Sequence, residues 1–207
     1  MRRKKIVFSW LIGLSCVFIF THCQKDSAPS IIIPDGKFLQ ALIELGVDTN
    51  GDSEISVSEA EVITSLDVSS KGISNMKGIE YFVNLERLYC QFNDLSNLDL
   101  SNNPFLQQLD CGANRITALD VSNNPRLTLL YCYDNQLNEL DLTYNTLLDS
   151  LACGENNLSQ LDLENNQRLK YLVCGYNNLS KLNIARQPYL EVLGCYSNKL
   201  TSLDVTK

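Results

Sequence analysis

The sequence predicts an α/β solenoid of seven stacked coils behind a small helical cap, and the spacing of its leucines is the main reason. Six leucines recur 21 residues apart without a slip: Leu85, Leu106, Leu127, Leu148, Leu169 and Leu190. Each opens the same phrase, with a second leucine three residues later, a cysteine five residues later and an asparagine eight residues later. One such coil cannot bury its own leucines, but stacked coils bury them against one another. A diverged copy of 22 residues begins at Ile63, so the solenoid is predicted to span 63–207.

Each repeat predicts a short strand around Leu88 to Cys90, then a turn and an extended return leg. A coil of 21 residues leaves no room for a helix in that leg. We therefore expect a parallel sheet along one side of the solenoid and few or no helices along the other.

The repeated phrase Leu85-x-x-Leu88-x-Cys90-x-x-Asn93-x-Leu95 resembles the leucine-rich-repeat family, most closely its short bacterial surface versions, which include the internalins. The resemblance covers residues 63–207. It implies a right-handed coil with a parallel concave sheet and few or no convex helices. It also implies that strand residues facing the concave surface select the ligand.

Six of the eight cysteines follow the same spacing: Cys90, Cys111, Cys132, Cys153, Cys174 and Cys195. Disulfides are one interpretation for an exported protein. Each cysteine, however, stands where a leucine would point into the core, and adjacent strands lie about 4.8 Å apart, farther than the roughly 3.8 Å that disulfide Cβ atoms prefer. We therefore expect buried, unpaired thiols. The asparagine column is expected to satisfy backbone groups of the turns.

Residues 1–22 read as a signal peptide, with four basic residues at positions 2–5 followed by a largely apolar run of 15 residues, Ile6 to Phe20. Cys23 follows directly and resembles the acylated first residue of bacterial lipoproteins. This predicts an exported, surface-exposed outer-membrane lipoprotein held to the membrane by lipid alone, with residues 23–35 as a tether. The alternative is an ordinary secreted protein with an incidental cysteine.

Residues 36–62 are expected to form a helical cap over the first coil, with helices over Lys37 to Leu45 and Val57 to Ile63. Between these helices lies a 12-residue stretch that resembles the EF-hand loop, also used in dockerin modules. The resemblance implies a structural Ca²⁺ held by Asp48, Asn50, Asp52, Glu54 (through its carbonyl) and Glu59. Ser53 stands where that loop normally has glycine. The alternative is a degenerate loop kept as a turn.

The concave strand positions are rich in aromatic residues, and these are the candidate ligand-binding residues: Tyr89, Phe92, Tyr131, Tyr133, Tyr171, Tyr176 and Tyr196. Tyrosine provides contact area, rigidity and a hydroxyl group. Protein ligands and sugar rings could both use such a surface. The alternative is that tyrosine simply suits exposed strands.

Composition argues against nucleic acid and against catalysis. The formal net charge of −7 repels phosphate backbones. The single histidine is His22, inside the predicted signal peptide, so a histidine-dependent nucleophile has no base. We expect a recognition or adhesion protein that binds a protein ligand at the cell surface. The alternatives are a glycan-binding accessory lipoprotein in polysaccharide capture and a structural envelope protein.

Overall fold

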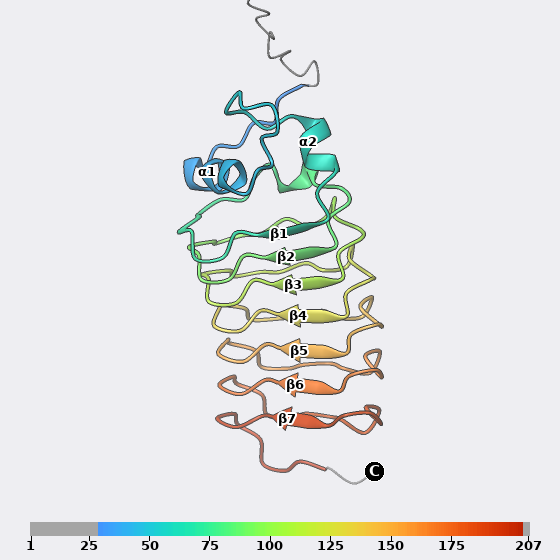
Figure 1. Cartoon of the computed structure of the whole chain (residues 1–207). Helices are drawn as coiled ribbons and strands as arrows, with labels where there is room; N and C mark the ends of the chain where they lie inside the picture. Colours follow the sequence, from blue (N-terminus) through green and yellow to red (C-terminus); the bar gives the residue numbers. More distant parts are fainter. Residues whose placement is uncertain (1–28, 205–207) are drawn as a thin grey trace, which may run out of the picture.

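Within residues 29–204, which the computed structural model describes, seven strands pair in chain order and form one parallel sheet (Figure 1). Each strand is three residues long: β1 (Ser65–Asp67), β2 (Arg87–Tyr89), β3 (Gln108–Asp110), β4 (Leu129–Tyr131), β5 (Ser150–Ala152), β6 (Tyr171–Val173) and β7 (Val192–Gly194). The central leucine of each strand faces that of the next, as Leu66 faces Leu88 and Leu88 faces Leu109. The register follows the repeat spacing, so the predicted parallel solenoid is confirmed.

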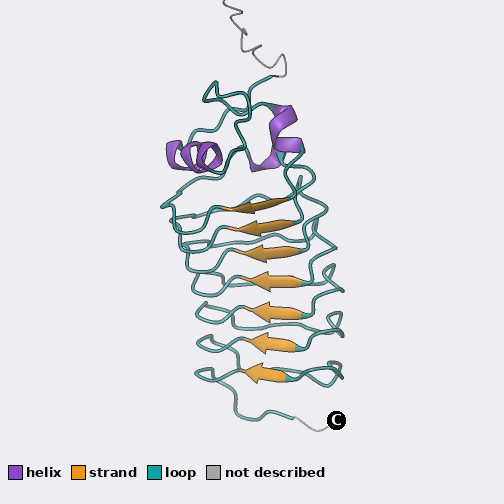
Figure 2. Cartoon of the chain, viewed as in Figure 1, coloured by secondary structure: helices purple, strands orange, loops and turns teal. Residues whose placement is uncertain are grey.

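The return legs between β2 and β7 contain no helix (Figure 2). One 3-10 turn, η1 (Ile79–Tyr81), lies in the return leg of the first coil. The prediction of few or no helices on this side is therefore confirmed for the part of the chain that the structure describes.

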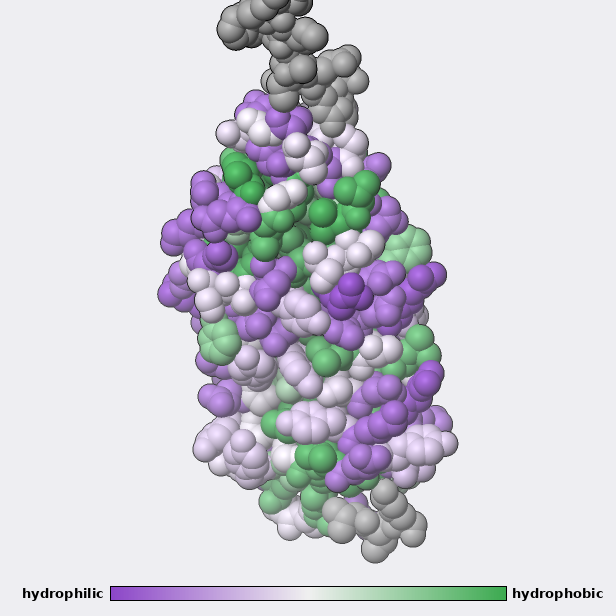
Figure 3. All heavy atoms as spheres, in the orientation of Figure 1, coloured by the Kyte–Doolittle hydropathy of each residue, from purple (hydrophilic) through white to green (hydrophobic). Residues whose placement is uncertain are grey.

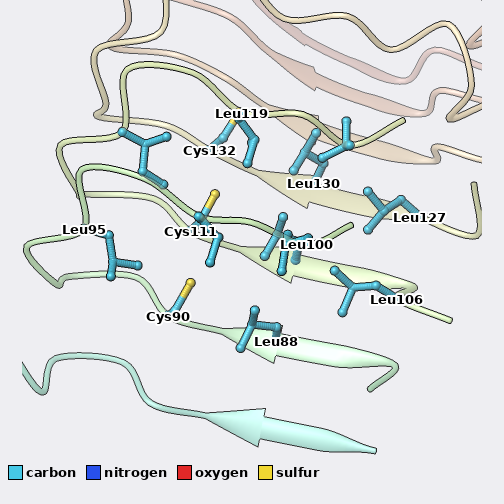
Figure 4. Packing of buried hydrophobic residues seen from close by; sticks show 14 of the residues in the cluster. Leu88, Cys90, Leu95, Leu100, Leu106, Cys111, Leu119, Leu127, Leu130 and Cys132 are labelled. Atoms are coloured by element: carbon cyan, nitrogen blue, oxygen red, sulfur yellow. The ribbon is translucent and has the colours of Figure 1, made fainter. Parts of the chain in front are cut away.

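The core runs through the middle of the coils as parallel columns of leucine and cysteine (Figure 4). Leu88, Cys90 and Leu95 are fully buried, and so are the same positions as far as the coil of β6, whereas Leu193, Cys195 and Leu200 of the last coil are partly buried. Each inner coil therefore buries its apolar residues against the coils on both sides, which is how a repeat too small for its own core becomes stable.

The predicted asparagine column joins neighbouring coils. Asn135 is representative: its side-chain oxygen accepts a hydrogen bond from the Ile116 N–H (2.9 Å), and its amide nitrogen donates to the carbonyls of Cys111 (3.0 Å) and Cys132 (3.2 Å). A single buried amide thus satisfies backbone groups of two coils. The predicted structural role of this column is confirmed.

A second polar column lies in the return legs and is not among the predicted positions. Its amides are fully or almost fully buried and 21 residues apart: Asn103, Asn124, Asn145, Asn166 and Gln187. Asn124 donates to the carbonyls of Leu100 (3.1 Å) and Asn103 (2.9 Å). The spacing is visible in the sequence and could have identified this column.

The cap consists of α1 (Gly36–Glu44) and α2 (Val57–Glu61), which lie over the β1 end of the solenoid (Figure 1). Phe38 and Leu42 of α1 are fully buried. Asp35 begins α1 by accepting hydrogen bonds from the Lys37 and Phe38 N–H groups, and its other oxygen accepts from the N–H of Ser74 in the first coil. The cap is therefore hydrogen-bonded to the solenoid as well as packed on it.

No helix of the described residues is long and apolar enough to cross a bilayer.

Residues 29–35, assigned above to a tether, instead pack against the cap. Ile31 is buried, and its N–H donates to the Ile55 carbonyl (2.7 Å), while the Val57 N–H donates to the Pro29 carbonyl (3.1 Å). The apolar Ile31 explains the difference, because its burial beside the loop contributes to folding as core residues do.

Candidate functional site

The residues on either side of each central leucine point outward, because successive side chains of a strand alternate between the two faces of a sheet. In β2 to β5, two partly exposed residues flank a buried leucine. We use the term sheet face for these outward residues of β1 to β7 together with the two residues that follow each inward cysteine.

Over β4 to β7 the sheet face contains a hollow of about 310 Å³. Five tyrosines, four small or branched residues and one carboxylate line it: Tyr131, Tyr133, Tyr171, Tyr176, Tyr196, Ala152, Gly154, Val173, Gly175 and Glu155. We call it the tyrosine hollow. In Figure 3, pale and green side chains occupy the middle of this half of the molecule, and purple side chains gather along one edge.

The structure thus brings together five of the seven aromatic residues that the sequence singles out. The other two, Tyr89 and Phe92, belong to the coil of β2 and lie outside the lining of the hollow. The Tyr89 hydroxyl instead donates to the Gln108 side chain (2.6 Å).

Glycines shape the floor of the hollow. A Cβ on Gly112 would collide with the Tyr133 ring, and one on Gly175 would lie 3.1 Å from the Tyr196 ring. Both rings therefore lie over a glycine of the preceding coil. Around a Cβ on Gly154 the nearest heavy atoms are backbone atoms of Gly175, 3.0 to 3.8 Å away, with no ring among them. The hollow opens where small residues stand between the two tyrosines.

One column at the rim of the sheet face has left-handed backbone in every coil from β2 onward. We call it the rim column, and its φ values lie between 50° and 59°: Phe92, Ala113, Asp134, Glu155, Tyr176 and Ser197. A residue with a Cβ adopts this conformation at a cost of about 1 kcal/mol or more. Glycine would suit the backbone better, yet all six positions carry a side chain. The rim column therefore places side chains on the surface at positions where the backbone conformation favours glycine.

The half of the sheet face over β1 to β3 is mostly polar, with Tyr89 and Phe92 as its aromatic residues. Asp110 is partly buried, and this burial raises the pKa of its carboxyl group. The hydrogen bond that the Gly112 N–H donates to this carboxyl (3.0 Å) lowers the pKa, whereas the nearby Asp67 carboxylate raises it. Burial also raises the pKa of Tyr133, as do the carboxylates of Asp110 and Asp134. The Tyr133 hydroxyl is therefore a neutral hydrogen-bonding group at neutral pH.

The stretch predicted to be a calcium loop forms a turn held by side-chain hydrogen bonds. Asp48 accepts hydrogen bonds from the Gly51 N–H (2.7 Å) and the Ser53 N–H (3.0 Å), and Asn50 accepts one from the Asp52 N–H (2.8 Å). Ser53 has a φ of 65°, the left-handed conformation that explains the usual glycine at this position. The segment thus forms a tight hydrogen-bonded turn with Ser53 in a strained conformation.

Glu59 is held differently from a calcium ligand. One carboxylate oxygen accepts from the Thr49 N–H (2.7 Å) and hydroxyl (2.8 Å), and the other accepts from the Ser56 N–H (2.9 Å) and hydroxyl (2.9 Å). Burial alone would raise the pKa of Glu59, but these hydrogen bonds from Ser56 and Thr49 outweigh it and lower the pKa to about 2. With Ser56 it also forms a capping box that begins α2.

Asp48, Asn50 and Asp52 supply the oxygen atoms that the calcium pattern requires, and these atoms now accept backbone hydrogen bonds. Glu59 would have to exchange its present partners to reach an ion. The Glu54 side chain accepts a hydrogen bond from the Ser30 hydroxyl. The resemblance assigns the backbone carbonyl of Glu54, and not this side chain, to the ion. Within residues 29–204 no group of three or more His, Cys, Asp or Glu side chains is placed to hold a metal ion.

The six cysteines of the repeats are unpaired, as predicted, and all but Cys195 are fully buried. Burial raises the pKa of Cys174 to about 12, and it raises the pKa of Cys90 well above its usual value. Such thiols stay protonated and are poor nucleophiles. Cys23, the predicted lipidation site, lies outside the described residues.

A parallel sheet built from 21-residue coils, with inward leucines and buried asparagines at the turns, defines the chain as a leucine-rich-repeat solenoid. In sequence it is 36% identical over 70 residues to Internalin J of Listeria monocytogenes, a match that covers 34% of this chain and 8% of that protein. No protein-family model matches the chain.

Among solved structures, an internalin of Listeria monocytogenes, InlF, is similar with a TM-score of 0.71 at 25% identity, over 83% of this chain and 59% of that one. A leucine-rich-repeat protein of Leptospira interrogans is similar in fold, with a TM-score of 0.64 at 22% identity, over 72% of this chain and 42% of that one. The chain thus has an internalin-like fold with repeats of about 21 residues, and it matches only part of the length of each relative. The matched proteins are internalin-like leucine-rich-repeat proteins, in agreement with the predicted absence of catalysis.

Proposed function

We propose that the chain is a recognition protein of the bacterial cell surface that binds a protein ligand on its sheet face, at the tyrosine hollow. The observation that carries the proposal is the gathering of five of the nine tyrosines around one hollow. Tyrosine is enriched at the energetic centres of protein interfaces, where it fills pockets at a small entropic cost. Internalin-like proteins typically mediate protein interactions or adhesion, which supports the same reading.

The test is binding of the purified chain to parallel arrays of cell-surface proteins and glycans, with the Tyr131→Ala/Tyr133→Ala variant alongside. Tyr144→Ala/Tyr189→Ala is the matched control, because both of these tyrosines are more than 60% exposed and neither lines the hollow. We expect a protein ligand that the hollow variant loses and the control variant retains. A glycan ligand with the same pattern would favour polysaccharide capture instead, and a ligand retained by both variants would remove the hollow from the proposal.

We further propose that the chain is anchored by a lipid on Cys23, on the outer face of the outer membrane. The support is the sequence pattern at residues 1–27. In cells, the native chain should take up a labelled fatty acid and partition with membranes, while Cys23→Ser should do neither. Equal membrane association of both forms would contradict the lipid anchor.

We infer that residues 48–59 bind calcium weakly and that the ion braces the cap. Because Glu59 must first release its hydrogen bonds, we expect a dissociation constant at the weak end of calcium modules, about 1 mM. At 10 mM CaCl₂ this gives about 1.4 kcal/mol of added stability, which thermal unfolding against EGTA can measure. Asp48→Asn/Asp52→Asn should abolish the gain, and the control Asp141→Asn/Asp162→Asn on the return legs should keep it. No gain in the native chain would leave the loop as a turn.

A further inference from the structure

The charge around the tyrosine hollow has one sign. On the sheet face of the four coils that begin at β4, the charged side chains are Asp134 and Glu155 of the rim column, and no lysine or arginine stands at a sheet-face position. Glu155 lines the hollow and is exposed. Its backbone bonds to neighbouring coils, but its carboxylate makes no ion pair or hydrogen bond within residues 29–204. The hollow therefore presents an unneutralised carboxylate beside five aromatic rings.

The basic residues of these coils lie elsewhere, and several are already paired. Arg168 and Lys170 lie 3.9 Å and 3.7 Å from the carboxylate of Asp149, and Arg186 lies 3.1 Å from Glu164. Residues 129–204 hold nine acidic and five basic side chains, a net charge of −4. An incoming cation thus meets a field of the favourable sign and no competing basic residue in the hollow.

The rings supply the second half of a cation site. Tyr176 and Tyr196 meet edge to face, with centroids 5.2 Å apart and an interplanar angle of 88°. The face of an aromatic ring is negative and attracts a guanidinium or ammonium group within about 6 Å of its centre. We propose that the tyrosine hollow receives the arginine or lysine side chain of a protein ligand, stacked against the tyrosine rings and paired with Glu155. This inference rests on the proposed function, and it names the chemistry of the group that is recognised.

The size of the hollow fits one such side chain. Its volume of about 310 Å³ equals roughly ten water molecules and lies at the lower end of the range for ligand pockets. An extended oligosaccharide would need a longer groove. The many hydroxyl groups of an oligosaccharide would also need several polar partners, whereas the lining offers tyrosine hydroxyls and a single carboxylate, Glu155.

The backbone at Glu155 provides a variant that separates stability from binding. Its φ of 55° is a conformation in which glycine would be more stable, and Tyr176, next in the rim column, has a φ of 53°. All six residues of the rim column share this conformation, so the strain belongs to the repeat and is not special to the hollow. Glu155→Gly should therefore keep or raise the melting temperature while it weakens binding. A merely structural residue would not separate the two measurements in this way.

The test is an NMR titration of the purified chain, with ¹³C-labelled tyrosine rings as reporters. The probe is the peptide acetyl-Gly-Arg-Gly-amide, and the matched probe carries citrulline, which has nearly the shape of arginine but no charge. We expect the arginine peptide to shift the ring signals that Tyr131→Phe and Tyr171→Phe identify as those of the hollow, with at least tenfold weaker binding of the citrulline peptide. Equal binding of the two peptides would overturn the proposal.

Variants then separate the parts of the site. Glu155→Gln should weaken the arginine peptide about tenfold, and Ala152→Leu, which fills the hollow from β5, should abolish the shifts. Glu191→Gln is the matched control, since Glu191 is exposed in the same coils but does not line the hollow. Unchanged binding by Glu155→Gln, or an equal loss in Glu191→Gln, would overturn the assignment to this site.

The outcomes also distinguish this inference from the proposed function. A protein ligand lost in Tyr131→Ala/Tyr133→Ala, together with equal binding of the arginine and citrulline peptides, would preserve the function and overturn the cation site. Charge-dependent peptide binding that needs Glu155, with no ligand on the protein array, would support the cation site and leave the function unsupported.

Discussion

The coils around β2 and β3 and the coils around β4 to β7 share one interior but have different sheet faces. Leu109 and Leu151 occupy the same buried position, as do Cys111 and Cys153. On the outside, by contrast, Asp110 of β3 corresponds to Ala152 of β5. The first half of the sheet face is mostly polar, whereas the second half has tyrosines around a hollow.

This difference separates what specifies the fold from what specifies the ligand. The interior positions recur because every coil must bury the same surfaces against its neighbours. The sheet face makes no contribution of that kind, so its residues are free to vary between coils. A change inside should therefore alter stability alone, and a change outside should alter binding with little effect on stability.

The largest expected effect is a contrast between two adjacent residues of β4. Leu130 is fully buried, while Tyr131 is partly exposed on the sheet face. Leu130→Ala should lower the free energy of unfolding by about 3 to 5 kcal/mol through lost burial and a cavity. Tyr131→Ala should lower it by less than about 1 kcal/mol. Urea unfolding measures both, and equal losses would contradict the separation of interior from face.

The second prediction compares the two asparagine columns. Asn135→Ala removes an acceptor and donors at once, and we expect a loss of about 2 to 3 kcal/mol from the backbone groups left unpaired. Asn124 donates to two carbonyls, but its own side-chain oxygen has no hydrogen-bond partner among the described residues. Asn124→Ala should therefore cost less, about 1 to 2 kcal/mol. Thermal unfolding of both variants measures which loss of stability is larger, with the exposed Asn123→Ala as control. A larger loss in Asn124→Ala than in Asn135→Ala would contradict the prediction.

The same contrast between interior and sheet face explains which features the sequence could predict. The leucine and cysteine columns predict the sheet and its register, because a repeated position must have one repeated environment. The position of the hollow depends on where the Tyr133 and Tyr196 rings lie, over Gly112 and Gly175. Side-chain direction of this kind is set by packing between coils and does not follow from the repeat.

The cap is harder to predict from the sequence than the coils are, because none of its contacts repeats. Residues 29–35 read as a tether by composition, but Ile31 packs beside Ile55. The loop at residues 48–59 is visible from its spacing, whereas the hydrogen bonds that hold Glu59 depend on Thr49, which the calcium pattern does not require. In a segment without repeats, one unconsidered residue is enough to change the interpretation.

A smaller effect is expected in the rim column, where both halves have the same strained backbone. Phe92→Gly should raise the free energy of unfolding by about 0.5 to 1 kcal/mol, since relief of the left-handed strain exceeds the added entropy of the unfolded chain. Tyr176→Gly should be nearly neutral, because the edge-to-face contact with Tyr196 is lost as well. Binding should fall in Tyr176→Gly and not in Phe92→Gly. Urea unfolding and the peptide titration test the pair, and equal binding losses would contradict the assignment of the ligand to the second half.

The smallest expected effect concerns the polar half, through Asp110. Burial and Asp67 raise the pKa of this carboxyl in the folded chain above its value in the unfolded chain, so its ionisation opposes folding. The destabilisation is present above the folded-state pKa and absent below the unfolded value of 3.8. Asp110→Asn, which can still accept from the Gly112 N–H, should therefore be more stable than the native chain at pH 7, by less than about 1 kcal/mol after solvent screening.

The gain from Asp110→Asn should vanish as the pH falls towards 3. Asp99 is the matched control of opposite sign, because hydrogen bonds from Ser101 lower the pKa of its carboxyl. Asp99→Asn should be slightly less stable than the native chain at pH 7, and that difference should also close at low pH. Urea unfolding of the three proteins between pH 3 and pH 7 measures both signs. If Asp110→Asn lost stability at pH 7, the Asp110 carboxylate would be a structural group of the polar half. Only the residues of the tyrosine half would then be free to vary without a loss of stability.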